Sequence, residues 1–173
     1  KYSLPEGFVL YVGDINWNKN IPGLLQAFVE LIKDKKYSNT HLVLVGSSFL
    51  KKDLVEAQEL DSIIGAENLT KNVKRVGFVP IGDLVGIYNL AKVYIQPSFD
   101  EGFGLSPLEA LSCGTPVVSS NKGSLPEVIG KPGDYFDPFA KDEIVKALKE
   151  NLSLPDSERK KKIQQGIQRA RTF

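Results

Sequence analysis

Two glutamates flank a glycine turn in the stretch SFDEGFGLSPLEALSCGTPVV, residues 98–118. Glu101 and Glu109 are eight positions apart, and Gly102 and Gly104 follow the first of them. Glycine lets a backbone approach a ligand closely, and a helix that begins just afterwards offers free N–H groups and partial positive charge. Those N–H groups suit a diphosphate, and the carboxylates suit the hydroxyls of a ribose and a sugar. These residues therefore predict a site for a sugar nucleotide.

The same stretch also allows a purely structural interpretation. Ser106-Pro107-Leu108-Glu109 matches a capping box, in which Ser106 begins a helix and Glu109 accepts the backbone N–H of that serine. Glu101 precedes the glycines in a loop, where an exposed glutamate without a role is ordinary. The glycines also lack the third member of a dinucleotide-binding fingerprint. The residues alone therefore leave a ligand site and a helix cap both open.

Six short apolar runs are predicted to be the strands that position this stretch. Near-continuous apolar runs of this length are typical of parallel strands that are covered on both faces. The runs are residues 8–13, 41–46, 73–79, 93–98, 116–120 and the weaker 134–138.

Amphipathic segments alternate with these runs and predict the helices. They are residues 21–36, with Asn20 as the expected N-cap, then 50–63, 82–91, 106–113 and 141–152, and a final basic helix from Asp156. The alternation predicts an α/β fold with a Rossmann-like, doubly wound parallel sheet. Loops at the carboxyl ends of such strands converge on one edge, where ligands bind. The only histidine, His41, begins a strand and is expected at the opposite edge.

Composition and charge narrow the possible functions. The 173 residues are 42% hydrophobic, which suits one domain with a substantial core. The net charge of +1 does not favour a nucleic-acid partner. The single cysteine excludes an internal disulfide, and the acidic residues show no metal-ligand spacing, so no required metal is predicted. The chain contains no methionine, and we interpret it as a piece of a longer protein.

The stretch from Val93 to Gly130 closely resembles the donor-binding signature of the group 1 glycosyltransferases, the retaining family four with a GT-B fold. The family pattern is proline-serine, two glutamates eight apart, glycine-x-proline-valine-valine and proline-glutamate-valine. The matching residues are Pro97, Ser98, Glu101, Glu109, Gly114, Pro116, Val117, Val118, Pro126, Glu127 and Val128. The segments 11–20 and 76–80 resemble the phosphate and nucleobase loops of the family.

The resemblance implies a role for each matched residue. Glu101 would contact the donor sugar near the reacting carbon, and Lys19 would neutralise the departing diphosphate, so these two are the expected catalytic residues. Glu109 would bind the ribose hydroxyls. The remaining donor contacts would come from the backbone of Gly13, of Phe78 and Val79 facing the base, and of Gly102, Phe103, Gly104 and Leu105. The family usually has an arginine where this chain has Asp14, so Asp14 must point away from the diphosphate or be neutralised.

The resemblance also implies a place in a larger enzyme. Residues 1–173 match a single nucleotide-sugar-binding domain, the C-terminal half of a GT-B fold, without the N-terminal acceptor domain. The donor is expected to be GDP-mannose, or else a UDP-hexose, and the acceptor a glycan or a lipid-linked glycan. The expected location is the cytoplasm, with attachment to the cytoplasmic face of a membrane left open. The isolated half is expected to be inactive. The alternatives are a non-catalytic nucleotide-binding or regulatory module and a GT-B sugar-nucleotide epimerase.

Overall fold

The apolar runs form one parallel six-stranded sheet in the computed structural model, which describes residues 1–173. The strand order is β3-β2-β1-β4-β5-β6, and every neighbouring pair is parallel. The six strands lie within the six predicted runs. They are β1 Val9–Val12, β2 Leu42–Val45, β3 Val73–Val76, β4 Val93–Gln96, β5 Val117–Ser120 and β6 Asp134–Phe136. The predicted doubly wound parallel sheet is confirmed.

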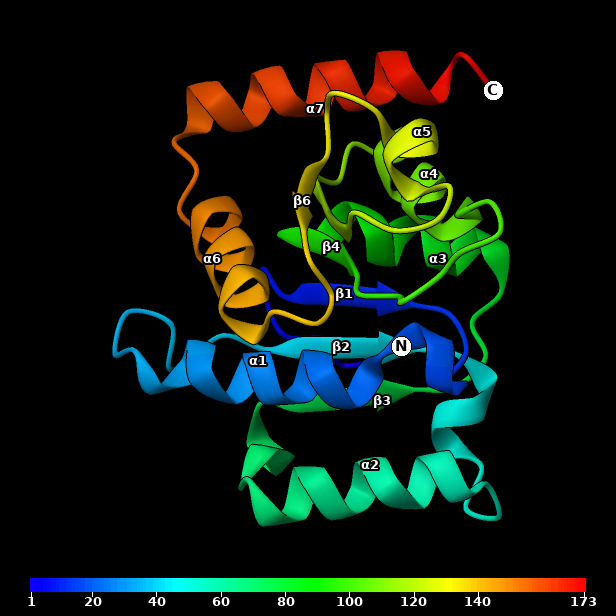
Figure 1. Cartoon of the computed structure of the whole chain (residues 1–173), viewed down its shortest axis with the longest axis vertical. Coiled ribbons are helices and arrows are strands. Elements are labelled where there is room, and N and C mark those ends of the chain that lie inside the picture. Colours follow the sequence, from blue (N-terminus) through cyan, green and yellow to red (C-terminus); the bar gives the residue numbers. More distant parts are fainter.

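Seven helices connect and cover the strands (Figure 1). They are α1 Ile21–Lys33, α2 Val55–Ala66, α3 Ile81–Leu90, α4 Leu105–Ser112, α5 Leu125–Ile129, α6 Lys141–Leu152 and α7 Asp156–Ala170. Three 3₁₀ turns add η1 Trp17–Lys19, η2 Ser47–Leu50 and η3 Leu69–Lys71. The helix predicted over 50–63 is in fact the end of η2 followed by α2. The sequence missed α5, which has only five residues and therefore shows no periodic pattern.

The two faces of the sheet carry separate cores. Alternate residues along β1 and just before it divide between them, with Val9 and Tyr11 in one cluster and Phe8 and Leu10 in the other. The first cluster packs under α1, α2 and α6, and the second under α3, α4 and α5. Because both faces are covered, β1, β2 and most of β4 are apolar, as the sequence pattern predicted. The edge strand β3 carries Lys74 and Arg75 instead.

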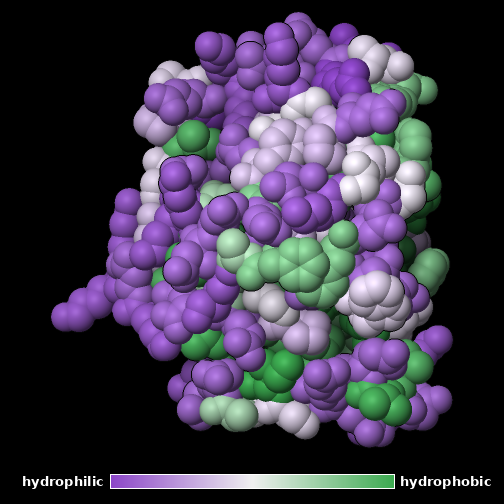
Figure 2. All heavy atoms as spheres, in the orientation of Figure 1, coloured by the Kyte–Doolittle hydropathy of each residue, from purple (hydrophilic) through white to green (hydrophobic).

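Helix α7 lies across α4 and α5 at one end of the molecule (Figure 1). Its only fully buried residue is Gly166, where a Cβ atom would come within 2.9 Å of Cδ2 of Leu111. A glycine therefore allows the close crossing with α4. The exposed face of α7 carries mostly hydrophilic side chains (Figure 2). No helix has the length and apolar character needed to cross a membrane.

The start of α1 differs from the prediction in its chemistry. Asn20 occupies the N-cap position, but with φ of 52° and ψ of 40° it is left-handed, and its side chain makes no cap hydrogen bond. Instead, Nδ2 of Asn20 donates to the backbone oxygen of Pro138 at 3.0 Å. The side chain therefore ties the start of α1 to the segment after β6. Asn20 is the N-cap residue, as predicted, but it does not cap the helix through its side chain.

Candidate functional site

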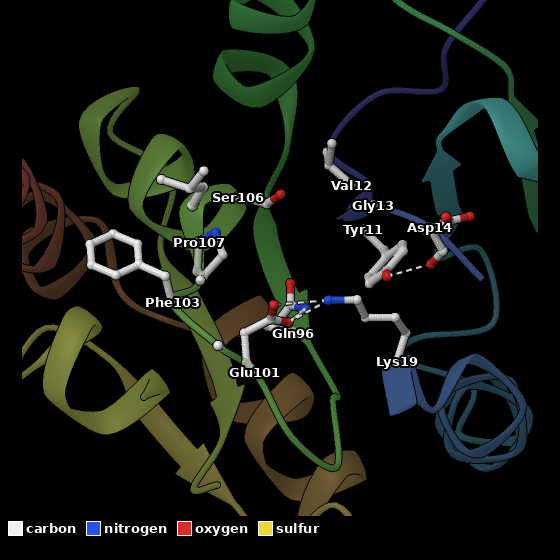
Figure 3. A pocket seen from close by; sticks show the side chains of 13 residues that line it. Tyr11, Val12, Gly13, Asp14, Lys19, Gln96, Glu101, Phe103, Ser106 and Pro107 are labelled. Atoms are coloured by element: carbon white, nitrogen blue, oxygen red, sulfur yellow. Dashed lines mark hydrogen bonds and ion pairs between the residues drawn. The ribbon is translucent and has the colours of Figure 1, made fainter. Parts of the chain in front are cut away.

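The strand order reverses between β1 and β4, and a cavity of about 320 Å³ lies at this switch point. Its wall combines the end of β1, Lys19 of η1, Gln96 of β4 and residues 101–107 (Figure 3). Two of the loops predicted at the carboxyl edge, those after β1 and β4, therefore meet there. This is the position at which doubly wound sheets bind their ligands.

Lys19 and Glu101 form an ion pair inside this cavity (Figure 3). Nζ of Lys19 lies 2.9 Å from Oε1 and 2.7 Å from Oε2 of Glu101. The two side chains are only 17% and 15% exposed. The backbone N–H of Phe99 donates to the oxygen of Asn18 at 2.7 Å and joins the loops that carry them. The structure thus brings together the two residues expected to be catalytic, which are 82 positions apart in the sequence.

Glu101 is also held from the sheet side by Gln96, which the sequence reasoning missed, and by Ser98, which it matched to the family pattern without assigning a contact. Nε2 of Gln96 donates to Oε2 of Glu101 at 3.1 Å, and Oγ of Ser98 donates to the same oxygen at 3.2 Å. Gln96 is 2% exposed and Ser98 is fully buried. A signal was available, because a glutamine that ends an otherwise apolar strand must find hydrogen-bond partners when it is buried.

The backbone of Glu101 is fixed from the other side by α5. Its carbonyl oxygen accepts hydrogen bonds from Oγ of Ser124 at 2.9 Å and from the N–H of Ser124 at 3.2 Å. Gly123 lies directly beneath, where a Cβ atom would come within 2.7 Å of the same carbonyl oxygen. Side chain and backbone are therefore both held before any ligand arrives.

Helix α4 begins two residues earlier than the capping-box pattern predicted, because that pattern places the N-cap at Ser106. Gly104, with φ of 92°, is the N-cap residue, and the helix starts at Leu105 without a side-chain cap. Ser106 is therefore the second helical residue, and the predicted capping box is wrong. The first N–H groups of a helix have no partner within it, so those of Leu105 and Ser106 are available at the cavity wall. Pro107 follows and has no N–H to offer.

Glu109 has a different setting from Glu101. It is exposed, it does not line the cavity, and Oε2 accepts a hydrogen bond from the hydroxyl of Tyr88 at 2.9 Å. Burial, and after it the charge of Glu109, raises the pKa of Tyr88, so the hydroxyl keeps its proton. Glu109 is thus oriented by α3 beside the cavity, and its expected contact with a ribose stays a prediction.

A second cavity of about 260 Å³ adjoins the first and shares Val12, Gly13 and Asp14 with it. Phe78 and Val79 line it, with Phe78 exposed and Val79 buried. The two residues expected to face a nucleobase therefore lie in the neighbouring hollow. That they bind a base stays a prediction.

Asp14 does not face the ion pair. Its Oδ1 accepts hydrogen bonds from the hydroxyl of Ser48 and from the N–H of Ile15, the latter at 2.9 Å. The carboxylate is directed away from Lys19 (Figure 3). The bond from Ser48 is the main reason that the pKa of Asp14 lies below its usual range. Asp14 lines both cavities, and its expected orientation relative to a diphosphate stays a prediction.

Tyr11 supports the same turn from below. Its hydroxyl donates to the backbone oxygen of Asp14 at 2.7 Å, and burial raises its pKa well above the ordinary value. A Cβ atom at Gly13 would come within 2.8 Å of that hydroxyl, so only glycine fits there. The chain has no cluster of three or more His, Cys, Asp or Glu side chains that could hold a metal ion.

The family model described as "Glycosyl transferases group 1" matches residues 3–169. The chain is 37% identical over 174 residues to O-antigen chain mannosyltransferase B of Escherichia coli, with 100% of this chain and 44% of the relative covered. It is 35% identical to the serotype-specific mannosyltransferase WbdA of Escherichia coli, over 88% of this chain and 18% of the relative.

A solved structure gives the same result. The sucrose-phosphate synthase of Thermosynechococcus elongatus superposes with a TM-score of 0.83 and 29% identity, covering 98% of this chain and 42% of that chain. The chain therefore spans less than half the length of these relatives. The match of the family model over nearly the whole chain and the shared fold lead to one conclusion: this chain belongs to the group 1 glycosyltransferase family.

Proposed function

We propose that residues 1–173 are the donor-binding half of a retaining glycosyltransferase that transfers a mannosyl group from GDP-mannose to a glycan or lipid-linked acceptor. In this proposal, the two cavities at the switch point hold one nucleoside-diphosphate sugar. The base lies near Phe78 and Val79, the ribose near Glu109, and the sugar near Glu101.

The observation that carries the proposal is the ion pair between Lys19 and Glu101 opposite the start of α4. A lysine ammonium has three N–H donors, and Glu101 takes two of its contacts, so one N–H can reach a phosphate oxygen. The start of α4 adds to this attraction for a phosphate, through the free N–H groups of Leu105 and Ser106 and the positive end of the helix dipole. Lys19 and α4 would thus stabilise the departing diphosphate without a metal ion.

Two relatives named as mannosyltransferases support mannose as the transferred sugar. A UDP-hexose is the second choice. Family membership and these relatives favour a transferase over a regulatory module or an epimerase.

The acceptor side is proposed to come from an N-terminal domain of the same protein. A donor site at the edge of a sheet is open to water, which would compete with the acceptor and weaken each contact to the diphosphate. A closing domain would exclude that water. We therefore propose that the 173-residue chain alone transfers no sugar, and that the whole protein works in the cytoplasm or at the cytoplasmic face of a membrane, without nucleic acid.

Thermal unfolding of the chain with GDP-mannose, UDP-glucose and ADP-glucose tests the donor. A ligand at about 100 times its dissociation constant should stabilise the chain by ~2.7 kcal/mol. We expect the largest shift in melting temperature with GDP-mannose. Lys19→Met should abolish that shift, whereas Lys146→Met, on the exposed face of α6, should keep it. Equal shifts for wild type and Lys19→Met would contradict the proposed site.

A further inference from the structure

The two carboxylate oxygens of Glu101 are unequally occupied. Oε2 accepts hydrogen bonds from Nζ of Lys19 at 2.7 Å, from Nε2 of Gln96 at 3.1 Å and from Oγ of Ser98 at 3.2 Å. Oε1 accepts one, from Nζ of Lys19 at 2.9 Å. A carboxylate offers about four lone-pair sites in total. The remaining capacity of Glu101 to accept a hydrogen bond is therefore on Oε1, within the cavity wall.

The orientation of Gln96 follows from its partners on both sides. The hydroxyl of the fully buried Tyr94 donates to Oε1 of Gln96, and burial raises the pKa of Tyr94 well above its ordinary value. Because the carboxylate of Glu101 offers only acceptors, the amide nitrogen of Gln96 faces it and the amide oxygen faces the hydroxyl of Tyr94, which also lies 3.3 Å from the backbone oxygen of Val12. The two N–H groups of Nε2 then face Ser98, at 2.8 Å, and Glu101. A chain of donors thus runs from Tyr94 to Glu101.

We propose that Gln96 is a positioning residue, which anchors Oε2 of Glu101 and leaves Oε1 free to accept a hydroxyl of the donor sugar. The inference rests on the proposed function. Without the anchor, Oε2 would keep only Lys19 and Ser98 as donors, and the carboxylate could turn partway about its last bond, which would move Oε1 out of line with the sugar hydroxyl. Gln96 lies behind Glu101 and away from Phe78, Val79 and the second cavity, so its effect should fall on the sugar and not on the nucleotide.

The test compares the dissociation constants of GDP-mannose and GDP for the 173-residue chain by calorimetry. Gln96→Met keeps the length of the side chain and removes its hydrogen bonds. We expect it to raise the dissociation constant of GDP-mannose roughly tenfold and to leave that of GDP unchanged. UDP-glucose and UDP replace this pair if the unfolding experiment selects a uridine donor.

Two further variants separate positioning from general loss of stability. Tyr94→Phe keeps the amide of Gln96 and removes only the hydroxyl that orients it, so part of the effect is expected. Asn151→Leu removes a fully buried polar side chain that bonds to Asp134, far from the cavity, and should leave the ratio of the two constants unchanged.

The outcomes distinguish the inference from the proposed function. A wild-type chain that binds neither GDP nor GDP-mannose, nor the uridine pair, contradicts the proposed function and the role of Gln96 together. If the wild type binds both ligands and folded Gln96→Met keeps the wild-type ratio, the inference alone is overturned.

Discussion

Glu101 and Glu109 hold equivalent places in the sequence pattern, yet the structure treats them differently. The side chain of Glu101 is 15% exposed and takes hydrogen bonds from Lys19, Gln96 and Ser98. Glu109 is exposed and takes one hydrogen bond, from Tyr88. Glu101 is therefore held by three neighbouring side chains, whereas Glu109, eight positions later, is held by a single hydrogen bond.

This difference indicates where the site is organised in advance. A group that acts at the reacting bond must be held in its working geometry by its neighbours, because small displacements cost large factors in rate. A group that only contributes affinity can gain its last contacts from the ligand. The arrangement around Glu101 fits the first requirement, and that around Glu109 fits the second.

The largest effect is expected from Glu101→Ala. It should lower transfer by the full-length protein by roughly 100-fold or more. It should also lower the free energy of unfolding by about 1–3 kcal/mol, because Lys19, Gln96 and Ser98 lose their shared partner. Urea unfolding and an assay with the proposed donor measure the two effects.

Glu30→Ala is the matched control for this change. Glu30 forms an exposed ion pair with Lys33 on α1, so its loss should change the free energy of unfolding by less than about 0.5 kcal/mol. Similar unfolding curves for the Glu101 and Glu30 variants would mean that the buried network does not hold Glu101.

The second effect tests the support beneath Glu101. Gly123 has φ of 57°, and an added Cβ atom would meet the backbone N and O of Glu101 at 2.8 and 2.7 Å. Gly123→Ala should therefore shift the loop and cost about 2 kcal/mol in the free energy of unfolding. At Gly102, next to Glu101 in the loop after β4, an added Cβ atom meets nothing within 4 Å, so Gly102→Ala should leave the free energy of unfolding nearly unchanged. Equal costs at the two positions would contradict this account of the loop.

The sheet could be predicted from the sequence because strands buried on both faces appear as short apolar runs. Central strands such as Leu42–Val45 are short apolar runs, which can be recognised without knowledge of their neighbours. The N-cap of α4 was placed two residues too late, at Ser106 instead of Gly104. The Ser106 to Glu109 pattern fits a capping box, but the left-handed Gly104 begins the helix first, and that depends on how the loop enters the cavity.

The sequence identified several residues of the candidate site but did not predict which of them contact one another. The resemblance selected Lys19 and Glu101, but no spacing rule pairs residues 82 positions apart. That pairing depends on β1 and β4 being neighbours in the sheet. Gln96 and Tyr94 were missed because a strand pattern records that a side chain is buried, and not what it bonds to.

A smaller effect is expected at Glu109. Glu109→Gln should lower the affinity for GDP roughly tenfold. It should leave the free energy of unfolding unchanged, because the side chain is exposed and has one partner. The loss should be much smaller for 2′-deoxy-GDP, which lacks a ribose hydroxyl. Calorimetry with both nucleotides measures it. An equal loss with both would indicate that Glu109 does not contact the 2′-hydroxyl.

The smallest effect on the free energy of unfolding is expected from the hydrogen bond between Ser48 and Asp14, at the turn between the two cavities. The bond from Ser48 lowers the pKa of Asp14 below 3.8, so it stabilises the fold above that pH, and the stabilisation is lost as the pH falls through the lowered value. Because Asp14 is exposed, Ser48→Ala should cost less than about 1 kcal/mol near neutral pH.

Unfolding in urea at about pH 7 and at about pH 2.5 should show the cost of Ser48→Ala shrinking at the lower pH. In an Asp14→Asn background, which cannot ionise, the cost of Ser48→Ala should not change with pH. A cost that is the same at both pH values in the wild-type background would mean that the charge of Asp14 contributes nothing to this turn.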